Sequence, residues 1–277
     1  MYSAKYINGN VYLTCPDGLD LKNTLDCGQA FRWSLNENGR WFGAAYGKYL
    51  ELSKEPDGTV VLYNTSKDDF ESVWKYYFDL ERDYNAVNGI LCRDATLKKA
   101  AAFSGGIRIL NQEPWETLCS FIISQNNNIK RIKGIINRLC ESFGDDMGGW
   151  YGFPPPDRLA VLSEDELAVL RSGFRAKYIL DAARKVSTGE INLESLKSVS
   201  LDEARDALVQ IKGVGPKVAD CVSLFSLCHI DAFPKDVWIK RAMQVLFNGE
   251  LPENAKPYAG IAQQYIFFYA RETKLNI

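Results

Sequence analysis

The segment Leu208–Cys221 constrains the fold of this chain more than any other stretch of its sequence. An apolar helix end runs into Gly213-Val214-Gly215, and Pro216 then starts a second helix. The two glycines allow backbone conformations that a side chain would hinder, and proline suits the first turn of a helix. The sequence therefore predicts a tight hairpin between two helices. Free backbone N–H groups at the start of the second helix would bind an anion such as phosphate, next to Lys217.

The rest of the chain divides into a β-rich beginning and a helical remainder. Three turn pairs separate short strand-like runs in the first 65 residues: Asn8-Gly9, Asn38-Gly39 and Asp57-Gly58. They predict a twisted antiparallel sheet of about four to six strands. From Asp68 onward the apolar period becomes helical. The expected helices cover residues 115–123, 129–143, 163–170, 175–187, 201–210, 216–228, 235–247 and 257–271.

These patterns predict an α+β fold. We expect an N-terminal antiparallel β domain with flanking helices over residues 1–100, and a mostly helical, two-lobed body that contains the hairpin over residues 101–277. The 277 residues are ample for a sizeable core, and 46% of them are apolar. No run of about 18 apolar residues occurs, so no membrane span is expected.

Charge and reactive residues exclude some kinds of site. A single histidine, His229, excludes sites that need several histidines. Seven cysteines, an odd number without a framework, fit reduced thiols in a cytosol. The net charge of −2 argues weakly against a DNA-binding protein, but basic residues gather locally, which allows a basic face on an acidic body.

The hairpin, together with the downstream Asp236, resembles the helix-hairpin-helix of the DNA glycosylase superfamily. In the lyase branch of that superfamily a lysine occupies the position of Lys217. A neutral lysine amine can attack the sugar C1′ and form a Schiff base, which then drives β-elimination of the 3′ phosphate. Burial and the positive end of the helix that starts at Pro216 would favour the neutral amine. Asp236 would stabilise the sugar cation or move protons, or it would only cap the next helix.

Further motifs resemble those of 8-oxoguanine DNA glycosylases. In the segment Cys27–Trp33, the resemblance implies that the Gly28 carbonyl accepts the N7–H that 8-oxoguanine has and guanine lacks. Gln263 and Phe267 are four apart and share a helix face, as an amide that reads a base edge and a ring that stacks on the base would require. Cys221 lies four residues after Lys217, where the family places a cysteine against the other side of the base.

The resemblance also implies which residues contact DNA. Asn126 would fill the gap left by the flipped nucleotide, and Arg131 and Arg175 would hydrogen-bond the orphaned cytosine. Phe174 and Trp238 depart from eukaryotic members, which usually carry tyrosine and histidine there, so we expect looser selection of cytosine. The remaining expected DNA contacts are Gly213, Gly215 and Val218.

We therefore expect a bifunctional 8-oxoguanine DNA glycosylase and abasic-site lyase. Two alternatives stay open: a glycosylase for another damaged purine, and a non-catalytic DNA-binding protein. The expected partner is duplex DNA with 8-oxoguanine opposite cytosine, bound by a monomeric, cytoplasmic, prokaryotic protein. No cofactor or catalytic metal is expected, and no iron–sulfur cluster, because no cysteine follows Cys228. The resemblance allows a structural monovalent cation at the carbonyls of Val209, Ile211 and Val214.

Overall fold

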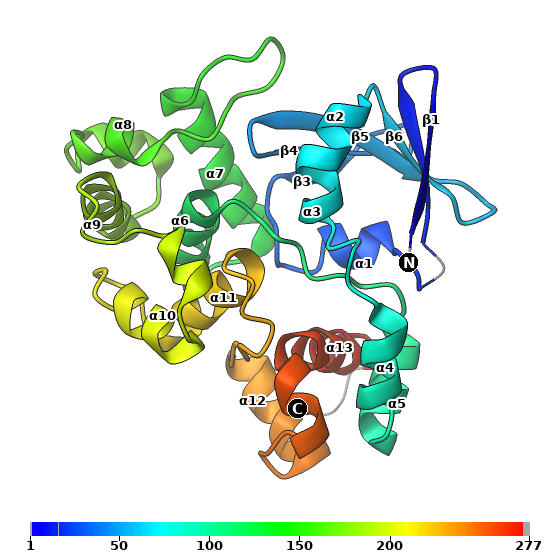
Figure 1. The fold of residues 1–277 in the computed structure, drawn as a ribbon. Helices are drawn as coiled ribbons and strands as arrows, with labels where there is room; N and C mark the ends of the chain where they lie inside the picture. The colour runs from blue at the N-terminus through cyan, green and yellow to red at the C-terminus, as the bar shows by residue number, and fades with distance from the viewer. Residues whose placement is uncertain (1, 16, 274–277) are drawn as a thin grey trace.

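The computed structural model describes residues 2–15 and 17–273. A β-sheet formed by the N-terminal residues lies beside a larger body of helices (Figure 1). The α+β fold class is therefore confirmed.

Among the described residues, the sheet has six antiparallel strands in the order β1-β2-β6-β5-β4-β3. The strands are β1 (Ser3–Ile7), β2 (Asn10–Thr14), β3 (Trp33–Leu35), β4 (Trp41–Ala45), β5 (Lys48–Lys54) and β6 (Val60–Tyr63). The three predicted turns link β1 to β2, β3 to β4 and β5 to β6. A fourth turn, at Tyr46-Gly47, was not predicted; it is left-handed at both residues, with φ of 51° and 69°.

Alternating apolar residues bury one face of the sheet, as a period of two requires. Val11 and Leu13 of β2 and Leu50 and Leu52 of β5 are fully buried. They pack against aromatic residues that include Trp33, whose indole N–H donates to the Tyr77 hydroxyl at 2.6 Å. Four short helices complete this part of the fold: α1 (Leu21–Leu25), α2 (Lys67–Asp69), the π-helix η1 (Phe70–Trp74) and α3 (Lys75–Tyr77).

The helical body forms two groups of helices with α11 between them (Figure 1). Its core extends from Tyr84 in α4 to Ala270 in α13 and includes Phe31 from the N-terminal part of the chain. The predicted division between residues 100 and 101 falls inside α5, and as a division into domains it stays a prediction. The helices are α4 (Tyr84–Leu91), α5 (Ala95–Phe103), α6 (Pro114–Ser124), α7 (Ile129–Phe143), α8 (Pro156–Ala160), η2 (Glu166–Leu170), α9 (Arg175–Ser187), η3 (Ser195–Ser198), α10 (Leu201–Leu208), α11 (Pro216–Ser226), α12 (Val237–Phe247), η4 (Glu253–Tyr258) and α13 (Ala259–Glu272).

One predicted helix is wrong in type. Residues 163–170 were expected to form an ordinary helix, but only the 3₁₀-helix η2 forms, from Glu166 to Leu170. Arg171 follows it in the left-handed conformation, with φ of 52°, and ends it. That reversal turns the chain toward α9, which supports the site described below.

Candidate functional site

The predicted hairpin joins α10 to α11. The Gly213 backbone is left-handed, with φ of 79°, and a Cβ there would meet the Tyr178 ring at 2.3 Å. Gly215 differs from the prediction, because its φ of −102° is extended backbone that any residue adopts. It precedes Pro216 at the start of α11, and a Cβ on it would meet no atom within 4 Å. The fold therefore requires glycine at position 213. At position 215 glycine leaves free space next to the first turn of α11.

The start of α11 can hold an anion. No side chain of the described residues caps this helix, so the first backbone N–H groups after Pro216 have no side-chain acceptor. Those of Lys217 and Val218 lie nearest the helix end. They offer the arrangement that binds phosphate.

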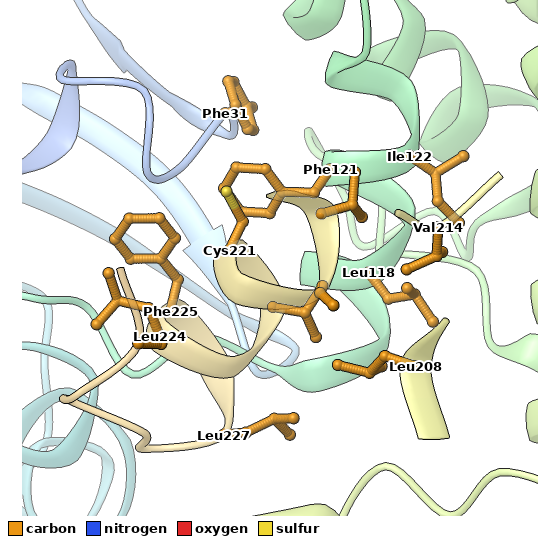
Figure 2. Packing of buried hydrophobic residues seen from close by; sticks show 14 of the residues in the cluster. Phe31, Leu118, Phe121, Ile122, Leu208, Val214, Cys221, Leu224, Phe225 and Leu227 are labelled. Atoms are coloured by element: carbon orange, nitrogen blue, oxygen red, sulfur yellow. The ribbon is translucent and has the colours of Figure 1, made fainter. Parts of the chain in front are cut away.

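Lys217 lies at the edge of an aromatic cluster. The Lys217 ammonium is 5.2 Å from the centre of the Phe121 ring. The Phe121 ring stacks on Phe225 at 5.6 Å and meets Phe31 edge-on at 5.7 Å. Figure 2 shows these rings with Cys221 where α11 packs on α6. The sequence analysis did not select Phe121, because an apolar residue in an apolar helix carries no signal beyond core packing.

Cys221 follows Lys217 by one helical turn and is buried. Burial raises the pKa of the Cys221 thiol to about 11, although the charge of Lys217 acts to lower it. The thiol therefore keeps its proton at neutral pH. Cys221 can serve as an apolar wall, with Lys217 as the reactive group beside it.

Asp236 is the N-cap of α12. Its Oδ1 accepts the Ile239 backbone N–H at 2.7 Å, and its side chain is half-buried. The predicted capping role is therefore present. One carboxylate oxygen remains to act on a substrate, because Oδ2 makes no bond to the described residues.

A single pocket of about 840 Å³ unites the residues expected to bind the base with those expected to react. The predicted residues that line it are Gly28, Asn126, Gly215, Lys217, Val218, Cys221, Asp236, Trp238, Gln263 and Phe267. Four other predicted residues do not line this pocket and lie beside or beneath its walls: Arg131, Phe174, Arg175 and Gly213.

Gly28 lies in the loop between α1 and β3. Its φ of 93° is left-handed, and the nearest atom to a Cβ there would be Ile129 Cδ1 at 4.0 Å. Lys133 of α7 holds this loop by donating to Asp26 Oδ1 at 3.1 Å and to the Trp33 carbonyl at 2.7 Å. Backbone conformation therefore requires glycine here, and the surrounding space stays open.

Gln263 and Phe267 form the wall that α13 contributes. Gln263 is buried, and its Nε2 donates to the Pro234 carbonyl at 3.2 Å. Phe267 is half-buried, with the Arg271 guanidinium 5.9 Å from its ring centre. Their spacing of four residues places both on the pocket side of one helix, as predicted.

The loop Gln125–Asn128, which we call the asparagine loop, connects α6 to α7. Asn126 is exposed and left-handed, with φ of 47°. Asn128 caps α7 by accepting the Arg131 backbone N–H at 3.0 Å. Asn126 is therefore an exposed residue of the pocket lining, and its insertion into DNA stays a prediction.

Arg175 lies beneath the asparagine loop in this structure, and its contact with a cytosine stays a prediction. The residue is 3% exposed, and its guanidinium donates to the carbonyls of Gln125, Asn126 (3.2 Å) and Ser172 (3.1 Å). The first turn of α9 places it beneath the asparagine loop. Burial also lowers the pKa of Arg175, with a contribution from Arg131. Arg175 thus supports Asn126, and exposed Arg131 remains available to DNA.

Phe174 and Trp238 are exposed, by 48% and 54% respectively. The Phe174 ring meets Tyr178 edge-on at 5.7 Å, and the Arg175 guanidinium is 4.5 Å from its centre. Trp238 lies in the first turn of α12. Both large apolar side chains are therefore exposed without being required by the core, and Trp238 also lines the pocket.

Two further results concern metals and membranes. Among residues 2–15 and 17–273, no group of three or more histidine, cysteine, aspartate or glutamate side chains could hold a metal ion. Within the same residues, every helix is too short or too polar to cross a membrane.

Comparisons with known proteins cover nearly the whole chain. Residues 12–118 match the family described as 8-oxoguanine DNA glycosylase, N-terminal domain, and residues 119–257 match the HhH-GPD superfamily base excision DNA repair proteins. An N-glycosylase/DNA lyase of Saccharomyces cerevisiae is 34% identical over 258 residues, covering 80% of this chain and 67% of the yeast protein. An N-glycosylase/DNA lyase of Arabidopsis thaliana is 32% identical over 273 residues, covering 91% and 73%.

One solved structure is similar over its full length. It is the Clostridium acetobutylicum 8-oxoguanine glycosylase/lyase in complex with double-stranded DNA that contains cytosine opposite 8-oxoguanine. Its TM-score is 0.90 at 40% identity, with 99% of each chain covered.

Proposed function

The chain belongs to the HhH-GPD superfamily of base excision DNA repair proteins, and from that premise we propose how it removes 8-oxoguanine from DNA. It is a bifunctional N-glycosylase and DNA lyase that acts on 8-oxoguanine opposite cytosine in duplex DNA. The observation that carries the assignment of roles is the shared pocket. Lys217 and Asp236 line it together with Gly28, Gln263 and Phe267.

The base is recognised outside the duplex. The damaged nucleotide rotates into the pocket, Asn126 fills the space it leaves, and Arg131 contacts the partner cytosine. Phe267 and Cys221 enclose the flat base, and Gln263 offers its amide to the base edge. The Gly28 carbonyl accepts the N7–H of 8-oxoguanine, a bond that guanine cannot make.

The reaction begins at C1′ of the flipped nucleotide. The Lys217 amine forms a bond to C1′ as the glycosidic bond breaks, and one of the two amine protons passes to the departing base. The Asp236 carboxylate stabilises the positive charge that develops on the sugar. The remaining amine proton then passes to O4′ as the bond between C1′ and O4′ breaks, which opens the sugar ring and gives the Schiff base.

Strand cleavage uses the same lysine. Removal of a proton from C2′ lets the electrons form a C2′–C3′ double bond as the bond from C3′ to the phosphate oxygen breaks. Water then hydrolyses the imine and returns the free Lys217 amine. The backbone N–H groups at the start of α11 hold a phosphate of the damaged strand throughout, near Gly213 and Gly215.

Borohydride trapping tests these roles. Reduction of the Schiff base should give a stable protein–DNA adduct on 8-oxoguanine duplexes, and Lys217→Gln should give none. Lys235→Gln is the matched control, since it removes another amine that lines the pocket and should leave the adduct in place. An adduct that survives Lys217→Gln, or no adduct with 8-oxoguanine DNA, contradicts the proposal. An adduct only with another damaged purine would favour a glycosylase for that purine. The absence of an adduct with any damaged DNA would favour a non-catalytic DNA-binding protein.

We also infer that the protein acts as a monomer in the cytoplasm of a prokaryote. One chain supplies the whole pocket, which supports a monomer. All seven cysteines are free thiols, which supports a reducing compartment.

A monovalent cation at the hairpin carbonyls of Val209, Ile211 and Val214 stays a proposal. The Ile211 carbonyl already accepts the Val214 N–H at 3.0 Å and keeps one lone pair for an ion. Measuring DNA affinity in potassium and in tetramethylammonium at equal ionic strength tests it.

A further inference from the structure

Gln264 bridges two walls of the base pocket. Its Nε2 donates to Gln263 Oε1 at 2.7 Å, and its Oε1 accepts the Cys27 thiol at 3.4 Å. Gln264 is 5% exposed and Cys27 is 4% exposed. Cys27 directly precedes Gly28, so one buried side chain connects the loop that carries Gly28 to the helix that carries Gln263.

The Pro234 carbonyl fixes the direction of this chain of hydrogen bonds. A carbonyl only accepts, so the Gln263 amide must turn its Nε2 toward Pro234 and its Oε1 toward Gln264. The opposite orientation would set the Gln263 NH₂ against the Gln264 NH₂ and two oxygens against each other. Two hydrogen bonds would become two repulsive contacts, so Gln264 and Pro234 together specify one orientation.

The thiol at the other end is suited to donate. Burial raises the pKa of Cys27 to about 11, so the thiol keeps its proton at neutral pH. Its other acceptor is the Thr24 carbonyl at the longer distance of 3.7 Å. The relay thus runs from the Cys27 thiol through Gln264 and Gln263 to Pro234, and each of its three hydrogen bonds joins a donor to an acceptor.

The oriented Gln263 amide keeps one N–H and one oxygen lone pair for a ligand. The Watson–Crick edge of an oxidised guanine presents an accepting oxygen beside a donating N–H, which matches that pair. If the Gln263 amide were rotated, its N–H would face the donating N–H of the base and its oxygen would face the accepting oxygen. Orientation of Gln263 therefore decides whether the edge is read.

We propose that Gln264 is a positioning residue for base recognition, which fixes the Gln263 amide and its placement relative to the Gly28 carbonyl. This inference rests on the proposed function, because it concerns how the same pocket reads 8-oxoguanine. The proposal predicts that loss of Gln264 slows base excision but does not slow cleavage of a preformed abasic site, because an abasic site presents no base edge.

The test compares two single-turnover rates for each variant, on 8-oxoguanine duplexes and on duplexes with a preformed abasic site. Gln264→Met keeps the size but loses both hydrogen bonds, and it should lower the ratio of excision to abasic cleavage by about 5- to 30-fold. Gln264→Glu can still accept from Cys27 but cannot donate to Gln263, and it should lower the ratio at least as much.

Tyr265→Phe is the matched control on the same helix. It removes the bond from the Tyr265 hydroxyl to Asn88 Oδ1, at 3.0 Å, which lies outside the pocket, and it should leave the ratio unchanged. Cys27→Ser retains a donor, whereas Cys27→Ala does not, so the serine variant should lose less of the ratio. That pair keeps the test decisive if a Gln264 variant fails to fold.

An unchanged ratio in a folded Gln264→Met protein overturns the inference, as does an equal loss of both rates, which marks a merely structural role. Equal ratios in the two Cys27 variants overturn it as well. A wild-type protein that cleaves abasic sites but never excises 8-oxoguanine overturns the proposed function itself, before any variant is compared.

Discussion

Gly213 lies against the ring of Tyr178, so that a Cβ on the glycine would be 2.3 Å from Cδ2 of the ring. This contact joins the phosphate-binding hairpin to α9, the helix whose first residue, Arg175, supports the asparagine loop. Asp181 of the same helix accepts the Lys212 backbone N–H at 2.8 Å. One helix therefore positions both the hairpin and Asn126.

Substitution of the two hairpin glycines should separate folding from binding. Gly213→Ala introduces a clash with Tyr178 and a strained backbone, and it should lower the free energy of unfolding by about 1–3 kcal/mol. Gly215→Ala meets no atom within 4 Å and should leave that free energy within about 0.5 kcal/mol. Its methyl group should nevertheless weaken binding to abasic-site DNA, because it projects where the phosphate lies. Urea unfolding and DNA titration measure both; equal stability of the two variants would contradict the assignment.

Asp236 combines a cap with a proposed catalytic carboxylate, and two substitutions distinguish them. Asp236→Asn keeps an oxygen for the Ile239 N–H, so stability should be unchanged while the excision rate falls by about 10²–10³-fold. Asp236→Ala should show the same loss of rate and should also lose about 1 kcal/mol of stability. Single-turnover excision and thermal unfolding provide the two readouts. A normal excision rate in the asparagine variant would leave Asp236 with capping alone.

Local sequence signals predicted the elements that build the site. Helix α9 is bounded as expected at Arg175 and Ser187, and α7 at Ile129 and Phe143, because apolar periodicity marks both helices and Asn128 caps the start of α7. The hairpin was predicted because two glycines followed by a proline, between two apolar helical segments, indicate a tight turn that leads into a new helix. Side chains that pair across long separations were not predicted.

The contact between Cys27 and Gln264 joins residues 237 positions apart, and nothing in either local pattern indicates it. The hydrogen bonds from Arg175 to the carbonyls of Gln125 and Asn126 join residues about 50 positions apart, and they were not predicted either. The reason for glycine at position 215 was predicted wrongly. The sequence alone does not distinguish a glycine that keeps space open from one that a left-handed backbone requires.

Phe174 and Trp238 predict relaxed selection of the opposite base. Phe174 lacks the hydroxyl of a tyrosine, and Trp238 stands where eukaryotic members usually carry a histidine; both side chains are exposed. Excision of 8-oxoguanine opposite adenine, guanine and thymine should therefore be within about tenfold of excision opposite cytosine, a difference near 1.4 kcal/mol. Phe174→Tyr should widen that difference. Rates opposite A, G and T as slow as those of a strictly cytosine-selective enzyme would refute the prediction.

Glu113, at the opposite end of α6 from the asparagine loop, should make stability depend on pH. Its carboxylate caps α6, accepting the N–H groups of Trp115 and Glu116. Burial first, and the charge of Glu116 in addition, raise the pKa of Glu113 from 4.5 to about 7. Between these values the folded protein binds a proton that the unfolded chain releases, so stability falls as pH rises from about 4.5 to about 7 and then levels off.

Glu113→Gln removes this titration but keeps an oxygen for the cap. The Tm of the variant should match that of the wild type near pH 4.5 and exceed it at pH 8. Each 1 kcal/mol no longer lost to burying the charged carboxylate should raise Tm by about 2–4 °C. Glu203→Gln is the control of opposite sign, since hydrogen bonds from Ser200 lower the pKa of Glu203 and its contribution is lost in acid. Thermal unfolding between about pH 3 and pH 8 gives the comparison, because the contribution of Glu203 is lost only below about pH 4.5. Parallel pH profiles for Glu113→Gln and the wild type would show that Glu113 does not carry the dependence.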